Sequence, residues 1–108
     1  YLPPSRQLAR AHLHAAGHAD WCDEVDAMID AHHRIRELPP GTRATVEVFR
    51  RADWIDVSRG VRRFGLPRDA VREVIAAFPN AGFHRRLAML TLQRLRRHPL
   101  DPLPMMRW

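Results

Sequence analysis

Apolar residues recur along this chain at the spacing of an α-helix. Val25, Met28, Ile29 and His32 stand at positions i, i+3, i+4 and i+7, which places their side chains on one face of a helix. The same spacing recurs within residues 71–78. A half-buried strand needs apolar residues at alternate positions, and no stretch of useful length has them. The pattern therefore predicts an all-α fold.

Residues that start or stop helices divide this pattern into about five predicted helices, arranged as a small helical bundle. Ser5 is a suitable N-cap for the first helix, after an extended entry at Pro3 and Pro4. Pro39 and Pro79 cannot continue the helices that precede them. The predicted helices cover residues 5–16, 20–37, 44–59, 67–78 and 83–98.

We expect residues 1–98 to form one helical domain and residues 99–108 to form an extended, proline-rich C-terminal tail. A length of 108 residues leaves no room for a second full domain. The chain begins at Tyr1, without a Met and without the pattern of a signal peptide. We therefore expect it to be a piece of a longer polypeptide.

The charge and cysteine content narrow the class of protein. The chain has 18 basic residues, all of them Arg, against 12 acidic ones, which gives a net charge of +6 and favours partners that carry phosphate. Cys22 is the single cysteine, so an intramolecular disulfide is excluded and a reducing, cytoplasmic location is expected. No apolar run approaches the ~20 residues needed to cross a bilayer, so no membrane partner is expected.

Two residues with metal-binding side chains interrupt the apolar faces, His32 in the second predicted helix and Asp53 in the third. Both side chains are expected to point inward. An inward His is more often a hydrogen-bonded core residue than a metal ligand. An inward carboxylate is costly unless it is paired or bound to a metal, so an ion pair between Asp53 and an Arg and metal ligation by Asp53 are equally open.

Four neighbouring residues are candidates to assist such a site. His33 lies about 100° around the helix from the first His of the doublet and is a candidate ligand of a second metal. Asp56, three residues after the inward Asp, is a candidate hydrogen-bond acceptor beside a ligand, or a solvated acid. Arg34 and Arg36 are candidates to bind phosphate, although a solvated basic helix end is the commoner reason for such residues.

Three segments, taken in order, resemble the C-terminal part of the HD-domain metal-dependent phosphohydrolase-like superfamily. They read MIDAHHRIR, VEVFRRADWIDVSRGVRRFGLP and AAFPNAGFHRRL, and the resemblance covers nearly the whole chain. It implies an all-α bundle, a divalent metal such as Mn, Fe, Mg or Zn, and a small phosphorylated substrate. Asp53, in the dipeptide Ala52-Asp53, matches a metal-binding Asp of the family, and the doublet His32-His33 resembles a position that supplies His ligands in members with two metals.

The chain departs from this family in lacking the His-Asp dipeptide that gives the family its name. The nearest approach is His18-Ala19-Asp20, with one intervening residue. The chain is therefore expected to be the back half of an HD domain, without catalytic activity by itself. In an intact relative the metal polarises a phosphoryl oxygen and activates water, and Arg34 or Arg36 neutralises the phosphate. Some relatives with two irons perform oxygen-dependent oxidation, so the resemblance does not fix the reaction.

The alternative is an Arg-rich helical module that binds nucleic acid or protein without catalysis. The pairs Arg62-Arg63, Arg85-Arg86 and Arg96-Arg97 support it. These arginines stand at varied helical phases, and no motif that reads a nucleic-acid groove is present, so nucleic acid is the less favoured partner. If helices are missing, apolar residues such as Val25, Met28, Ile29, Val46 and Phe49 would be left uncovered, which favours a homo-oligomer.

Overall fold

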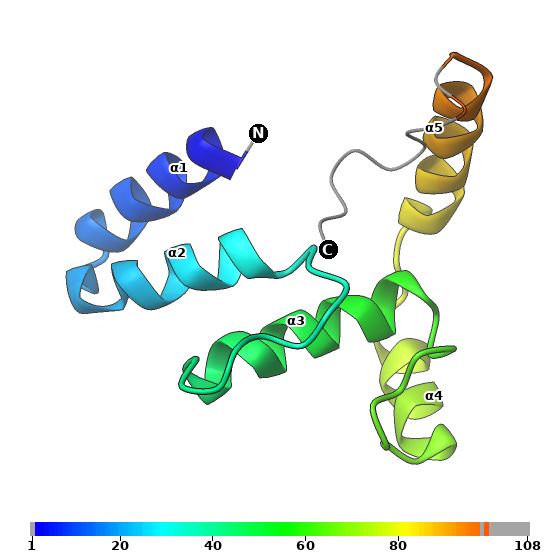
Figure 1. Cartoon of the computed structure of the whole chain (residues 1–108), viewed down its shortest axis with the longest axis horizontal. Helices are drawn as coiled ribbons and strands as arrows, with labels where there is room; N and C mark the ends of the chain where they lie inside the picture. Colours follow the sequence, from blue (N-terminus) through cyan, green and yellow to red (C-terminus); the bar gives the residue numbers. More distant parts are fainter. Residues whose placement is uncertain (1, 98, 100–108) are drawn as a thin grey trace. The chain divides into compact units, whose positions relative to one another are not determined.

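The described part of the chain is built from helices alone (Figure 1). The computed structural model describes residues 2–97 and Pro99, and these residues contain no strand. The predicted all-α fold class is therefore confirmed, and the predicted C-terminal tail lies outside the described residues apart from Pro99. The elements are α1 (Leu2–Ala15), the short 3-10 helix η1 (Ala19–Trp21), α2 (Cys22–Ala31), α3 (Ala44–Val57), α4 (Arg68–Ala77) and α5 (Phe83–Arg97).

The chain divides into two compact units, Tyr1–Trp54 and Ile55–Trp108. The division falls inside α3, so the first unit contains α1, α2 and most of α3, and the second contains the end of α3 with α4 and α5. The single domain expected over residues 1–98 stays a prediction. None of the described helices combines the length and the apolar character needed to cross a membrane.

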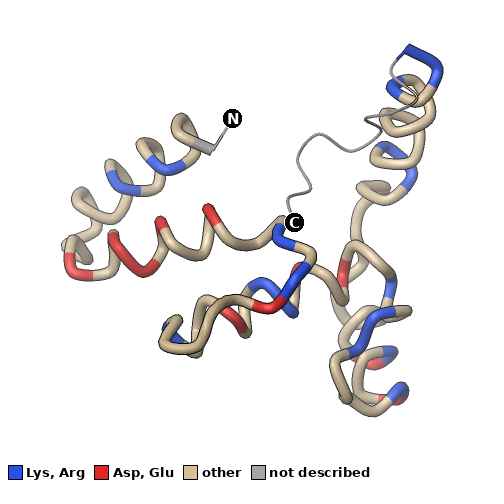
Figure 2. Tube along the Cα trace, in the orientation of Figure 1, with Lys and Arg blue, Asp and Glu red and all other residues tan. Residues whose placement is uncertain are grey.

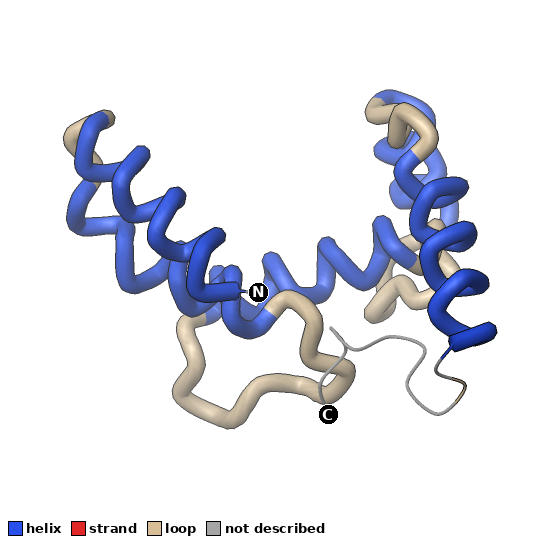
Figure 3. The backbone as a smooth tube through the Cα atoms, turned by 90° about the horizontal axis from the view of Figure 1, so that it is seen from above, coloured by secondary structure: helices blue, strands red, loops and turns tan. Residues whose placement is uncertain are grey.

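In the first unit, α1 and α2 form an antiparallel helical hairpin (Figures 1 and 3). Ion pairs fix its register, because Arg6 of α1 pairs with Asp30 at 3.0 Å and Arg10 pairs with Asp26 at 2.7 Å. Cys22 is buried in this unit. The extended entry expected at the start of the chain is wrong, since both prolines lie in the first turn of α1. Proline is tolerated there because the first N–H groups of a helix have no carbonyl partner.

The second helix ends at Ala31, six residues before the predicted end at Glu37. The carbonyls of Arg34 and Ile35 accept hydrogen bonds from the side chain of Arg50 instead of continuing the helix. The segment that follows runs back along α3 to reach its start. As a result α2 and α3 point in the same general direction in Figures 1 and 3.

Helix α3 buries one apolar and one charged residue on its inner face. Val46 is buried and Arg50, one turn later, has an exposed fraction of 0%. Phe49, on the same helix, is 45% exposed. The side chains of Val25 and Met28 are half-buried. The uncovered apolar surface expected for this group is therefore present at Phe49 and absent at Val46.

In the second unit, α4 packs against the loop that follows α3. Val71 is the buried residue of α4, and an added Cβ on Gly60 would lie 2.8 Å from its Cγ1 atom. Helix α5 has no buried residue among those described. Its apolar positions are largely open, with large exposed side chains at Phe83, Met89, Leu90, Leu92 and Leu95.

Candidate functional site

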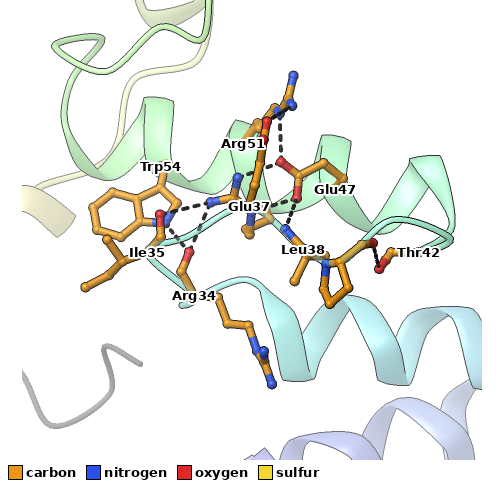
Figure 4. A network of polar contacts seen from close by, with 10 residues as sticks. Arg34, Ile35, Glu37, Leu38, Thr42, Glu47, Arg51 and Trp54 are labelled. Carbon is orange, nitrogen blue, oxygen red and sulfur yellow. Dashed lines mark hydrogen bonds and ion pairs between the residues drawn. The ribbon is translucent and has the colours of Figure 1, made fainter. Parts of the chain in front are cut away.

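The residue after the His32-His33 doublet is held on α3 by two side chains (Figure 4). Trp54 Nε1 donates a hydrogen bond of 2.9 Å to the carbonyl of Arg34, and Arg50 Nη1 donates one of 3.1 Å to the same oxygen. Arg50 and Trp54 are one turn apart, so they project from one side of α3. The segment just after α2 is thereby fixed against the second half of α3.

Glu47 holds the buried guanidinium of Arg50 from the preceding turn of α3. Arg50 donates to the carboxylate through Nε at 2.8 Å and Nη2 at 2.6 Å. Arg51 Nε adds a third bond of 2.8 Å, and the backbone N–H of Leu38 lies 3.4 Å from Oε2 (Figure 4). The hydrogen bond from Arg50 is the main cause that lowers the pKa of Glu47 to about 2. Glu47 is therefore ionised at any physiological pH.

Further along, the segment after α2 is tied to α3 by a second ion pair. Arg51 Nη2 lies 2.5 Å from Oε1 of Glu37. Together with the contacts at Arg34 and Leu38, this gives the returning segment three attachments on one helix (Figure 4). Contacts from α3 therefore hold in place the segment that follows the His doublet.

His32 is the C-cap of α2, and its ring is oriented by two contacts. Nδ1 lies 2.7 Å from the carbonyl oxygen of Ile29. A carbonyl only accepts hydrogen bonds, so Nδ1 carries the proton, and in the neutral ring Nε2 keeps its lone pair. The ring meets Phe49 of α3 edge to face, with centroids 6.4 Å apart. This leaves Nε2 in the form that binds metals.

Asp53 stands one turn after Phe49 on α3, on the same side of the helix. Its side chain is half-buried. Since His32 packs against Phe49, the two predicted ligands belong to one region of the first unit. Their direct coordination of a shared metal stays a prediction.

The four assisting candidates are placed differently. His33 is half-buried and its ring centroid lies 3.6 Å from that of His32, so the doublet stays together. Arg34 is tied through its backbone while its side chain is exposed, and Arg36 is exposed as well. Asp56 belongs to the second unit, where it is exposed and its carbonyl lies 2.7 Å from Nε2 of His84.

Within the part of the chain that the structure describes, no group of three or more His, Cys, Asp or Glu side chains is arranged to hold a metal ion. His32 and Asp53 are therefore at most part of a ligand set. A structural zinc site uses four ligands and a catalytic one uses three with an open position, so further donors would be needed.

The sequence analysis missed the two buried charges of the first unit, Arg50 and Asp26. Asp26 is 6% exposed, and its Oδ2 accepts from Arg10 at 2.7 Å, with Arg6 at 3.6 Å. Its Oδ1 has no hydrogen-bond partner among the described residues. The signal was present in the helical spacing, since Asp26 follows buried Cys22 by one turn and Arg50 follows buried Val46 by one turn.

Comparison of the chain with protein-family models, with curated proteins and with solved structures gives no match in any of the three.

Proposed function

We propose that this chain supplies part of the metal site of an HD-type phosphohydrolase, with Asp53 and His32 as two of the ligands. The observation that supports the proposal is the orientation of His32. Its Nδ1 is bonded to the carbonyl of Ile29 at 2.7 Å, and its ring lies against Phe49, one turn before Asp53. A metal-binding His almost always donates its second ring N–H to a carbonyl or carboxylate in this way.

The donor types fit the divalent metals that the resemblance implies. An imidazole nitrogen and a carboxylate oxygen suit Mn, Fe and Zn, which accept mixed nitrogen and oxygen ligands. The family resemblance implies a further His and a His-Asp pair, and this sequence contains no His-Asp dipeptide. A second polypeptide segment would therefore have to complete the ligand set.

The other candidate residues take the roles that their positions allow. When bound, a divalent metal supplies polarisation of a phosphoryl oxygen and a bound water of lowered pKa. The exposed guanidinium groups of Arg34 and Arg36 would bind the phosphate of a small substrate, because guanidinium matches phosphate geometry. His33, whose ring lies beside that of His32, is the candidate ligand of a second metal. Asp56 belongs to the second unit and receives no role in this site. We place the activity in the cytoplasm because buried Cys22 has no disulfide partner in the chain.

A Mn²⁺ titration followed by electron paramagnetic resonance of the free ion tests the ligand pair. Two protein ligands give weak binding, and we expect Asp53→Asn and His32→Gln each to weaken it by about tenfold or more. Asp69→Asn is the matched control, since it removes a carboxylate that is 95% exposed on α4, and it should change the affinity less than twofold. Equal affinities in all four proteins would overturn the proposal.

Two further measurements separate ligation from a structural role. Without metal, Asp53→Ala should lower the free energy of unfolding by less than about 1.5 kcal/mol. A decrease of ~3 kcal/mol or more would indicate a broken buried ion pair. The chain alone should release phosphate from a phosphate ester no faster than buffer does. Turnover that needs metal and Asp53 would contradict an incomplete ligand set.

A further inference from the structure

The positive charge of the chain is concentrated in its second unit. Residues 55–108 contain eleven Arg against four Asp or Glu, a balance of +7, whereas residues 1–54 contain seven Arg against eight acids, a balance of −1. Figure 2 shows basic positions on α1, acidic positions on α2, both kinds on α3, and mostly basic positions in the rest of the described chain. The net charge of the molecule is thus a property of this unit.

Four of these arginines surround one cavity between the loop after α3 and helix α4. The cavity has a volume of about 480 Å³ and is lined by Arg59, Arg63, Arg68 and Arg72. Apolar side chains, including Val71 and Ile75, complete its lining, and no acidic residue takes part. This volume falls in the range of sites that hold small ligands, ~300 to 1,000 Å³.

The described part of the chain places few partners beside these four guanidinium groups. Among the described residues, the side chains of Arg59 and Arg68 have no hydrogen-bond or ion-pair partner, and Arg63 donates only to the carbonyl of Leu66, at 3.3 Å. Arg72 approaches Asp69 at 3.9 Å, with both side chains more than three-quarters exposed. An exposed pair at this distance contributes little.

Five of the seven arginines of the first unit provide the contrast, whereas Arg34 and Arg36 have exposed side chains. Carboxylates hold Arg6, Arg10, Arg43, Arg50 and Arg51 at N–O distances of 2.5 to 3.4 Å. In the first unit, the arginines that form ion pairs thus each have a carboxylate close to the guanidinium group. Within the described residues, Arg59, Arg63 and Arg68 form no ion pair with a carboxylate, and Arg72 has only the exposed Asp69 at 3.9 Å, which leaves their donors available to an anion from solution.

The loop that carries Arg59 and Arg63 is held in place beside α4. Arg59 and Gly60 both have positive φ angles, 52° and 79°, and the N–H of Gly60 donates to the carbonyl of Ile55 at 2.8 Å. These are features of a Schellman-type end to α3. A Cβ on Gly60 would lie 2.8 Å from Cγ1 of Val71, so the loop backbone touches α4 directly. The cavity is thereby formed before any ligand arrives.

We propose that this cavity binds an oligophosphate, meaning two or more linked phosphate groups such as those of a nucleoside diphosphate or triphosphate. Guanidinium groups bind phosphate oxygens through paired hydrogen bonds, and four of them exceed what one phosphate group requires. The apolar part of the lining is suited to the remainder of a small ligand. None of these residues belongs to the proposed metal site, so the inference does not depend on that proposal.

Calorimetric titration with inorganic tripolyphosphate tests the site in the whole chain. Arg68→Gln and Arg72→Gln should each weaken binding by about tenfold, the effect of one charge-assisted hydrogen bond or more. Arg96→Gln is the control, because it removes the same charge from an exposed position on α5, outside the cavity, and should weaken binding less than twofold. Orthophosphate should bind the wild-type chain at least about tenfold more weakly than tripolyphosphate.

Three outcomes would overturn the proposal. The first is equal weakening by Arg68→Gln and Arg96→Gln, which would mean that net charge alone attracts the anion. The second is binding of tripolyphosphate weaker than about 10 mM in low salt. The third is a single-stranded RNA oligonucleotide that binds more tightly than tripolyphosphate and loses affinity in Arg68→Gln, which would make nucleic acid the ligand of this surface.

Discussion

Glu47 and Arg50, three residues apart on α3, form an ion pair with two hydrogen bonds in which Arg50 has no exposed surface. The remaining Nη1 donor of Arg50 is directed to the carbonyls of Arg34 and Ile35. One buried cation thus joins α3 to the chain segment that follows the His doublet. The carboxylate of Glu47 stabilises this buried cation, because an uncompensated buried charge is strongly unfavourable.

Glu47→Gln is expected to lower the free energy of unfolding by about 3 kcal/mol, since it removes the carboxylate charge that accepts two hydrogen bonds from the buried Arg50 cation. Urea unfolding followed by circular dichroism measures the change. Glu73→Gln is the control, because Glu73 is exposed on α4, and its effect should stay within about 0.5 kcal/mol. A loss below about 1 kcal/mol in Glu47→Gln would show that this pair does not hold the first unit together.

The stability of the chain should fall in acid through the titration of Glu47. Hydrogen bonds from Arg50 lower the pKa of Glu47 from 4.5 to about 2 in the folded chain. A lowered folded-state pKa contributes stability that is complete above the unfolded value and is lost as pH falls from about 4.5 toward 2. Unfolding measured across this range should show a steeper loss in the wild-type chain than in Glu47→Gln. Parallel pH profiles of the two proteins would contradict this account.

The buried Asp26 predicts a specific pattern of mutational effects in the α1–α2 hairpin. Arg10→Met should destabilise the chain, because it removes the bond of 2.7 Å to a carboxylate that is nearly buried. The double variant Arg10→Met, Asp26→Leu should be more stable than Arg10→Met alone, since an apolar pair leaves no buried charge unpaired. Thermal unfolding of the two variants and the wild type gives the order. A double variant less stable than the single one would show that Asp26 is not dependent on Arg10.

Helical spacing and turn residues were enough to predict the all-α class and most helix positions, because local sequence determines both. The end of α2 could not be predicted in this way. The carbonyls of Arg34 and Ile35 leave the helix for donors on Arg50 and Trp54, which are distant in sequence. The buried charges were missed for a related reason. Spacing alone does not show which charged side chain finds a partner.

From the sequence, the candidate site could be predicted only as a His and an Asp that each lie on an apolar helix face. The sequence indicated that His32 and Asp53 lie on apolar faces, and the structure places His32 against Phe49, on the side of α3 that carries Asp53. The contact that fixes the ring, from Nδ1 to the carbonyl of Ile29, is made at the C-cap of α2, which ends at Ala31. The phosphate-binding candidates Arg34 and Arg36 stayed exposed, while the arginines that line a cavity are in the other unit.

Substitution of two glycines separates backbone strain from close packing in the second unit. Gly60 and Gly65 have similar φ angles, 79° and 85°, but only Gly60 has a neighbour within 4 Å of an added Cβ. Gly65→Ala should cost about 1 kcal/mol, the cost of a positive φ in a residue with a side chain. Gly60→Ala should cost more, because its Cβ would meet Val71 at 2.8 Å. Hydrogen exchange of the α4 amides measures the loss of stability in both variants. Equal protection of these amides in the two variants would show that the loop does not pack on α4.

The position of bound Mn²⁺, mapped by paramagnetic broadening of backbone amide resonances, tests the proposed metal site most directly. The proposal predicts that signals of His32, His33 and Asp53 lose intensity at the lowest Mn²⁺ concentrations, and that Asp53→Asn removes this selective loss. Broadening centred on the acidic residues Asp23 and Glu24 at the start of α2, unchanged in Asp53→Asn, would contradict it.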